Sequence, residues 1–256
     1  MNFLSLVVKL FRLPTSSKIN SFYRNAILLT IVILFSGCAN VSTGINKVET
    51  LSTPTSSAKL VVMPLDVELS VLTAAGLLEP QAEWTENAIQ HIKTHISNQM
   101  AQGDVSVEFF EQTDTSVESK LVQLEKLHEV VGSRIMLHQL GVQKLPSKKD
   151  QEPDWSLGLD AALIKEKTGA DYALFLFVRD SYASAGRAGM MVFVAIASMG
   201  NVALSGGQQV GFASLVDLNS GDIVWFNRLV SGSGDLRTED AAAKSVSALL
   251  KGFPAS

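Results

Sequence analysis

Apolar and polar positions over residues 59–256 follow two different periods along the chain. Residues 59–65 and 173–178 are apolar on both faces, which predicts two central strands. Apolar residues recur every three or four positions over about 83–102 and 116–139, which predicts two amphipathic helices. We therefore expect strands and helices to alternate in the first part of this region.

Shorter elements complete the pattern. Residues 105–109 alternate between apolar and polar, as in a half-buried strand, and a short helix is expected at about 156–167. Residues 212–218 and 223–230 flank a polar, glycine-containing turn, which predicts a β-hairpin, and a last helix begins near Thr238. The order β-α-β-α-α-β-β-β-α predicts an α/β (α+β) fold, in which helices pack on a mixed sheet of about five strands.

One segment of this domain carries no charge. Residues 188–207, within an apolar insert at 185–207, contain no Asp, Glu, Lys or Arg. Their length approaches that of a membrane span, but Gly200 and Asn201 interrupt them. The segment also lacks the alternating pattern of a barrel strand. Three interpretations stay open: packing inside the subunit, contact with another protein or with a membrane, and a true span.

The N-terminal segment is similar to the export signal of bacterial lipoproteins. Four basic residues and no acidic residue precede an apolar run at 26–35, which has the length of a signal-peptide core and is short for a membrane span. The run ends in Phe35-Ser36-Gly37-Cys38, which resembles the lipobox, with phenylalanine in place of the usual leucine. The resemblance implies that residues 1–37 are a lipoprotein signal peptide and that Cys38 is acylated.

Residues 38–58 are expected to join this anchor to the domain. After the cysteine they are mostly small or polar and show no periodicity, which predicts a flexible tether. Ala39, rather than Asp, follows the cysteine, and by resemblance to lipoprotein sorting this implies the outer membrane. Residues 59–256 would then form a single periplasmic globular domain.

The charge of the chain narrows the class of partner. Removal of the signal peptide leaves 17 Lys and Arg against 25 Asp and Glu, a formal charge of −8. Because binding to a phosphate backbone needs a basic surface, we expect no nucleic acid partner. We expect contact with the membrane through the lipid anchor, and a partner that is an envelope protein or a second copy of the chain.

Two short segments carry a resemblance to a group of envelope lipoproteins. They are Gly169-Ala-Asp-Tyr-Ala-Leu174, a turn that enters a central strand, and Val216-Asp-Leu-Asn-Ser-Gly-Asp-Ile-Val-Trp225, a later hairpin. The group includes the curli-secretion channel lipoprotein and the lipoprotein activators of penicillin-binding proteins, and the chain is most similar to proteobacterial envelope lipoproteins. The resemblance implies a fold and a location in the envelope.

No residue pattern in the chain predicts catalysis, a cofactor or a metal site. Cys38 is the only cysteine, and once acylated it cannot act as a nucleophile. His91 and His95 are spaced to share one face of a helix, as in metal pairs, but no third ligand accompanies them. His128 and His138 are predicted to lie at the surface or at the end of a helix.

A candidate binding edge follows from the predicted topology. If the first and third strands are parallel, the hairpin makes the last strand parallel to the third, and their carboxyl ends share one edge, where open α/β sheets form a ligand crevice. Seven polar residues would gather there: Asp66, Glu68, Arg179, Asp180, Tyr182, Asp235 and Arg237. Two interpretations are open: a site for a peptide, glycan or anionic group, or a set of ion pairs that close the loops.

The sequence therefore predicts a non-catalytic outer-membrane lipoprotein that acts as a binding, scaffold or regulatory module in the periplasm. One alternative is a homo-oligomeric assembly or secretion-channel component, with residues 188–207 as the contact. Another is an enzyme that modifies envelope material.

Overall fold

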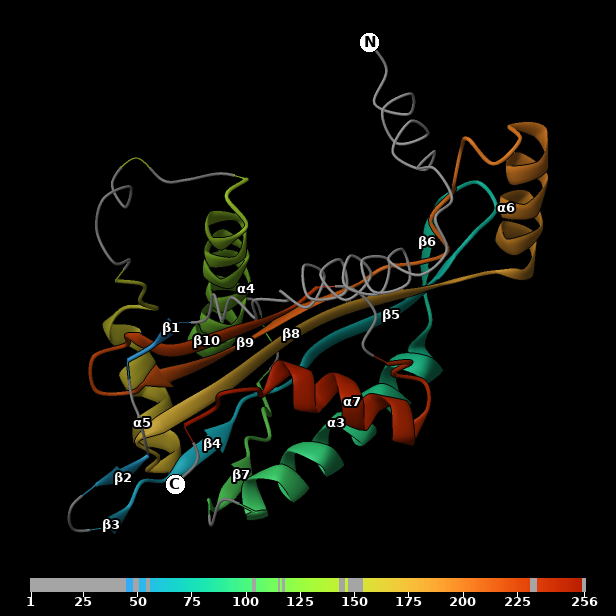
Figure 1. Ribbon diagram of the computed structural model, residues 1–256. Coiled ribbons are helices and arrows are strands. Elements are labelled where there is room, and N and C mark those ends of the chain that lie inside the picture. The colour runs from blue at the N-terminus through green and yellow to red at the C-terminus, as the bar shows by residue number, and fades with distance from the viewer. Residues whose placement is uncertain are drawn as a thin grey trace, which may run out of the picture. The chain divides into compact units, whose positions relative to one another are not determined.

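The sheet is built around one long strand, β8 (Tyr172–Ala183), which is buried along most of its length (Figure 1). One side of β8 pairs in parallel first with β4 (Leu60–Val62) and then with β5 (Asp66–Leu72). Its other side pairs antiparallel with β9 (Gln209–Asp217), which pairs antiparallel with β10 (Ile223–Val230). The two strand directions confirm the predicted mixed sheet.

The computed structural model describes residues 45–47, 51–53, 56–102, 105–114, 116, 118–142, 146, 154–230 and 234–254. Within them the strand order is β1-β10-β9-β8-β4-β7. β5 pairs with β8 further along that strand than β4 does, and β6 pairs with β5. The strands not yet given are β1 (Ile45–Asn46), β6 (Leu78–Pro80), β7 (Val107–Phe109) and the separate pair β2 (Ser52–Thr53) and β3 (Ser56–Ser57). The sheet thus has more strands than the five or so that the sequence predicts.

Pro64 divides the first predicted strand in two. Proline has no N–H to donate to the ladder with β8, so β4 ends before it. The Met63 N–H still donates to the Leu174 carbonyl at 2.9 Å, and the chain resumes as β5 at Asp66. β5 then continues to Leu72, beyond the predicted end at residue 65, and forms a hairpin with β6.

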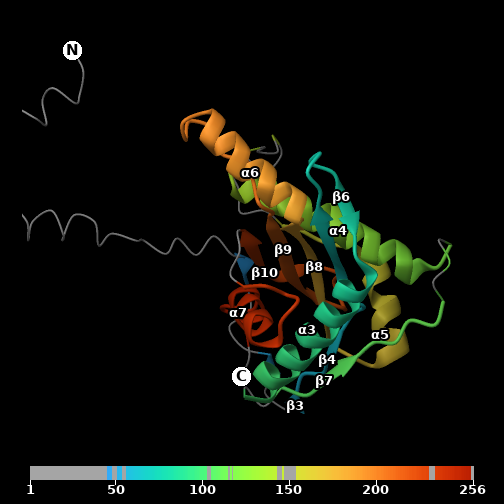
Figure 2. The same cartoon turned by 90° about the vertical axis from the view of Figure 1, so that its right-hand side faces the viewer.

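Helices cover both faces of the sheet (Figure 2). α3 (Ala82–Gln102) and α7 (Glu239–Leu249) pack against one face, and α4 (Lys120–Gln139), η2 (Leu159–Ala161) and α5 (Ala162–Thr168) pack against the other. A further helix, α6 (Ala185–Ala197), lies beyond the covered part of the sheet, between β8 and β9 (Figure 1).

Alternate residues of β8 fill two separate cores. Leu174 and Leu176 pack with the residues of α3 and α7, whereas Phe175 and Phe177 pack with those of α4 and α5. Side chains alternate across a strand, so a strand that is apolar on both faces must be covered on both. The prediction that residues 173–178 form a central strand is confirmed.

α4 comes very close to the sheet at Gly132. A Cβ atom added to this glycine would lie 2.0 Å from Cε2 of Phe212 on β9. The Phe212 ring is fully buried and stacks on the rings of Phe177 and Phe226, with centroids 4.8 and 5.7 Å apart. The absence of a side chain at residue 132 therefore allows the helix and the aromatic layer to touch.

The sheet includes residues that precede the predicted start of the domain. Ile45 and Asn46 pair with Phe226 and Trp225 of β10, and Leu51 is buried and donates its N–H to a carbonyl near the C-terminus. These residues lie in the segment 38–58 that the sequence assigns to a flexible tether. The predicted signal peptide and Cys38 lie outside the described residues.

Candidate functional site

The topology that the candidate edge requires is present. β4 and β5 run parallel to β8, and the two antiparallel pairings of β9 make β10 parallel to β8 as well. The prediction that the first, third and last strands run in one direction is confirmed. The seven candidate residues, however, do not form one surface.

Strand alternation divides these residues between two faces of the sheet. Arg179 and Asp180 are neighbours on β8, so their side chains point to opposite faces. Arg179 pairs with Asp66 on the side of α4, whereas Asp180 bonds Tyr182 and Gln209 on the side of α3 and α7. This corrects the single binding edge, because the sequence argument placed the residues along the edge without separating its two faces.

On the α4 side, Asp66 is the centre of an ion-pair cluster. Arg179 Nη2 lies 2.7 Å from Asp66 Oδ1, and Arg179 Nη1 donates to the Asp66 carbonyl at 3.1 Å. The same guanidinium lies over the Phe177 ring, 4.1 Å from its centroid. Lys126 of α4 lies 3.8 Å from Asp66 Oδ2 and 3.3 Å from Glu129 Oε2. The cluster joins β5, β8 and α4 to one another. On this face the structure therefore agrees with the interpretation of the residues as ion pairs within the protein.

Two more carboxylates lie near this cluster and differ in their surroundings. Glu68 is exposed and accepts a long hydrogen bond of 3.4 Å from the Ser70 hydroxyl. Glu125 of α4 is half-buried, and burial together with the negative charge of Asp66 raises its pKa to about 7, against the opposing effect of Lys126. The sequence argument missed Glu125, although its place beside the apolar stripe of α4 is visible in the pattern.

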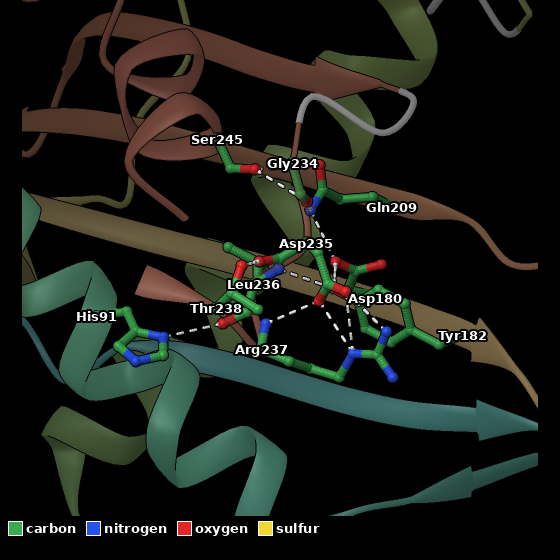
Figure 3. A network of polar contacts seen from close by, with 10 residues as sticks. All are labelled: His91, Asp180, Tyr182, Gln209, Gly234, Asp235, Leu236, Arg237, Thr238 and Ser245. Atoms are coloured by element: carbon green, nitrogen blue, oxygen red, sulfur yellow. Dashed lines mark hydrogen bonds and ion pairs between the residues drawn. The ribbon is translucent and has the colours of Figure 1, made fainter. Parts of the chain in front are cut away.

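On the other face, Asp180 is the acceptor of a buried network (Figure 3). Its Oδ2 accepts from the Tyr182 hydroxyl at 2.6 Å and from Gln209 Nε2 at 2.7 Å. Gln209 Nε2 also donates to the Gly234 carbonyl, and the Leu236 N–H donates to the Tyr182 hydroxyl oxygen. Burial raises the pKa of Asp180 in spite of these donors, and burial and Asp180 raise the pKa of Tyr182.

Arg237 closes the network on its exposed side. Its Nε and Nη2 donate to the two carboxylate oxygens of Asp235 at 2.9 and 2.7 Å, which lowers the pKa of Asp235. The guanidinium lies 3.8 Å from the Tyr182 ring centroid and 4.8 Å from that of Trp84 on α3. The residues of this cluster therefore bind one another, and they hold the connection between β10 and α7 against β8 and α3.

His91 and His95 take part in the same attachment. His91 Nδ1 lies 3.1 Å from the Leu236 carbonyl, and His95 Nε2 lies 3.0 Å from the Glu239 carbonyl. Both rings are thus used to hold the start of α7 on α3. In the described residues, no three His, Cys, Asp or Glu side chains are grouped so as to hold a metal ion.

His128 is the one histidine whose predicted position is wrong. It is 2% exposed, its ring stacks on Phe175 with centroids 4.8 Å apart, and its Nε2 lies 2.9 Å from the Ser214 hydroxyl. Burial lowers its pKa to about 3. Its spacing from Leu124 places it on the buried stripe of α4, a signal that the sequence does contain.

α6 differs from every other helix given above, because none of its residues is buried. Phe193 is 67% exposed and Ile196 74% exposed, and Met199 just after the helix is 92% exposed. Only Arg187, Met191 and Val194 are half-buried, and they lie on one side of the helix. Its apolar residues are therefore exposed over most of its circumference.

Local hydrogen bonds hold α6 in place at both ends. The Ser184 hydroxyl accepts from the Arg187 N–H at the start, and Arg187 Nε donates to the Ser205 carbonyl of the returning loop at 3.0 Å. Beyond the helix, the Gly200 N–H donates to the Ala195 carbonyl at 2.7 Å.

Among the described residues, no helix combines the length and the apolar character needed to cross a membrane. The interpretation of this helix as subunit core is wrong.

Comparisons with known proteins give distant likenesses of structure. No protein-family model and no curated protein sequence matches the chain. The PelC dodecamer from Paraburkholderia phytofirmans is similar at a TM-score of 0.37 with 12% identity, covering 78% of this chain and 89% of PelC. The C-terminal domain of LpoB from Salmonella enterica is similar at a TM-score of 0.25 with 15% identity, covering 70% of this chain and 87% of that domain.

The resemblance to envelope lipoproteins that the sequence implies is found in part, at low identity. The TM-scores are too low for these likenesses to carry an argument about what the chain does. The resemblance to the curli-secretion channel stays a prediction.

Proposed function

We propose that this chain is a non-catalytic outer-membrane lipoprotein, anchored by acylated Cys38, that binds another envelope protein or further copies of itself through α6. The observation that carries the proposal is the exposure of apolar side chains around α6. A helix that is apolar on nearly all sides is normally buried in a protein or in a membrane. In water its exposed side chains favour association.

The dimensions of α6 support a protein contact over a membrane span. A helix of 13 residues is about 20 Å long, whereas the hydrocarbon core of a bilayer is about 30 Å thick. The two clusters at the sheet edge support a non-catalytic role, since Asp66 and Asp235 each lie in an ion pair with an arginine. α6 is then the part of the domain with the strongest physical reason to meet a partner.

Cross-linking in living cells tests the proposal. The variant carries Val192→Asp, Phe193→Asp and Ile196→Asp, which place charges on the exposed side of α6. The wild-type protein should give cross-linked products with itself or with one envelope protein, and the variant should lose them. Because the three side chains are exposed, the free energy of unfolding should change by no more than about 0.5 kcal/mol for each substitution.

Leu159→Asp is the matched control, because Leu159 is 78% exposed and lies far along the chain from α6. This variant should keep the cross-linked products. A ladder of the chain with itself would identify an assembly, and a second protein would identify an adaptor. Products that survive in the α6 variant, or wild-type protein that gives none, would contradict the proposal.

A further inference from the structure

A groove lies outside the carboxyl ends of β4 and β7, and none of its lining residues belongs to α6. It has a volume of about 560 Å³ and is lined by residues of both strands, of α3 on one face of the sheet and of α4 on the other. β4 and β7 are parallel, so their carboxyl ends lie side by side. Ligands of open α/β sheets bind at this position, and pockets for small molecules have about this size.

The lining of the groove is mostly apolar but contains two acceptor atoms without a partner. Met63, Phe109 and Val122 are among its apolar residues. In the described structure, Oε1 of Gln112 and Oε1 of Glu125 are buried and accept no hydrogen bond. The orientation of the Gln112 amide is fixed, because its Nε2 donates to the Asp114 carbonyl at 2.9 Å. The two residues that carry these atoms both line the groove.

Carboxylates outnumber cations in the lining of the groove, which favours a donor that is also a cation. Glu111 and Glu125 line it together with one cation, Lys93, which lies over the Phe109 ring. Lys126 lies in ion pairs with Asp66 and Glu129, and Arg179 lies in one with Asp66. The pKa of Glu125 is raised to about 7, first by burial and next by the charge of Asp66. A buried carboxylate without a hydrogen-bond partner is costly, and a cation placed against it removes that cost.

A second groove on the same domain differs from the first, because its charged residues are paired with each other. It has a volume of about 530 Å³ and lies between α4 and the segment at residues 157–160. Its two charged residues, Lys120 and Asp160, lie 3.3 Å apart in an ion pair. Its charges are therefore satisfied within the protein.

We propose that the groove beyond β4 and β7 binds a small organic amine, whose ammonium group donates to Glu125 and Gln112 and whose apolar body packs on Met63 and Phe109. This site is a function beyond the assembly through α6 and shares no residue with it. Loss of the α6 contact and loss of amine binding can therefore be observed separately.

Calorimetric titration of the full-length protein in lipid nanodiscs tests the proposal, with empty discs subtracted. The probe is 2-phenylethylamine, and 2-phenylethanol and 3-phenylpropionate are matched ligands that lack the positive charge. The amine should bind saturably at one site, the alcohol more weakly, and the acid least. Glu125→Gln should weaken amine binding about tenfold, the effect of losing one charged hydrogen bond.

Glu129→Gln is the control, because Glu129 lies one turn further along α4 and does not line the groove. It should leave amine binding unchanged. The pH dependence of amine binding gives a second test. The other charged residues that line the groove are Lys93 and Glu111, and Asp66 and Lys126 adjoin it. Binding to the wild type should strengthen from pH 6 to pH 8 as Glu125 loses its proton, and Glu125→Gln should remove that increase. Equal binding of all three probes, no saturable binding, or unchanged binding by Glu125→Gln would overturn the proposal.

Discussion

Helix α4 has charged and polar residues on much of its surface, yet it buries Leu121, Leu124 and Ile135 against the sheet. Helix α6 has one charged residue, Arg187, and buries no residue at all. The more polar helix is thus a part of the core, and the more apolar helix is exposed. Because α4 carries its apolar residues in one stripe, it can bury that stripe and leave its other side in water.

α6 has no such division into two sides. Exposed apolar residues surround it except along the line of Arg187, Met191 and Val194. A single sheet face can cover only one side of a helix, so a helix of this composition stays incompletely covered in one subunit. The difference between α4 and α6 shows that the arrangement of apolar residues along a helix, and not their number, decides burial inside the domain.

At neutral pH, the largest effect is expected where α4 touches the sheet. Gly132→Ala would place a methyl group 2.0 Å from Phe212, whose ring is held between neighbouring aromatic rings. Alanine favours a helix over glycine by about 1 kcal/mol, but overpacking of a core costs about 1–3 kcal/mol and sometimes more. Because the approach to Phe212 is so close, we expect the upper end of this cost, about 3 kcal/mol, so the free energy of unfolding should fall by a net of about 2 kcal/mol, as measured by urea denaturation.

An unchanged or higher stability of Gly132→Ala would contradict this expectation. It would mean that Phe212 can move aside, and that the contact between α4 and the sheet is looser than the structure shows. Phe212→Leu in the same background is the control, because a smaller side chain at residue 212 would give the methyl group space and recover part of the loss.

An effect that is small near neutral pH and grows as the pH falls is expected from the buried His128. Its pKa is lowered to about 3 in the folded protein, whereas an unfolded chain takes up the proton near pH 6.5. As pH falls from about 6.5 to 3, the unfolded state therefore binds a proton that the folded state does not, and stability is lost. The loss from this group is up to about 1.4 kcal/mol for each pH unit.

His128→Gln should remove that loss, because glutamine can still bond Ser214 but does not titrate. The measurement is urea unfolding at several values between pH 4 and pH 7. Glu125 acts in the opposite direction, since its raised pKa means that the folded protein holds a proton that the unfolded one has lost. The difference between wild type and variant at each pH separates the two groups. Parallel curves for the two proteins would contradict the prediction.

Much of the fold can be predicted because its helices and strands carry regular periods. The expected helix at 83–102 coincides with α3 at Ala82–Gln102, and the expected hairpin with β9 and β10. The extension of the first strand beyond Pro64 could not be read from the sequence. Proline normally ends a strand. Pairing resumes after Pro64 because β8 is long enough to pair with residues 66–72 as well.

The candidate site was predictable only as a place on the sheet. The direction of the strands was predicted correctly, and Asp66 and Arg179 are in contact. Asp66, however, is the first residue of β5 and Arg179 lies within β8, so the pair is not at the carboxyl ends of these two strands. That Arg179 and Asp180 face opposite sides of the sheet follows from strand alternation alone, whereas which helices cover each side depends on the fold. Gln112 and Glu125 were missed because they belong to a loop and a helix that only the fold brings to the same groove.

The smallest effect is expected in α6, where Gly189 is a helix glycine like Gly132 of α4 but is exposed. A Cβ atom added to Gly189 has no atom within 4 Å, so Gly189→Ala gains helix propensity without a clash. The gain of about 0.5–1 kcal/mol should increase the protection of α6 amides from hydrogen exchange roughly two- to fivefold and leave the protection of the sheet unchanged.

Hydrogen exchange of the α6 amides should be measured in the dilute protein and in the cross-linked protein. Increased protection in both states would place the partner on another side of the helix. Increased protection in the dilute protein with fewer cross-linked products would place the contact at Gly189, because the new methyl group would then occupy space that the partner needs. Decreased protection in the dilute protein would contradict the exposure of this side of α6, and with it the difference between α4 and α6.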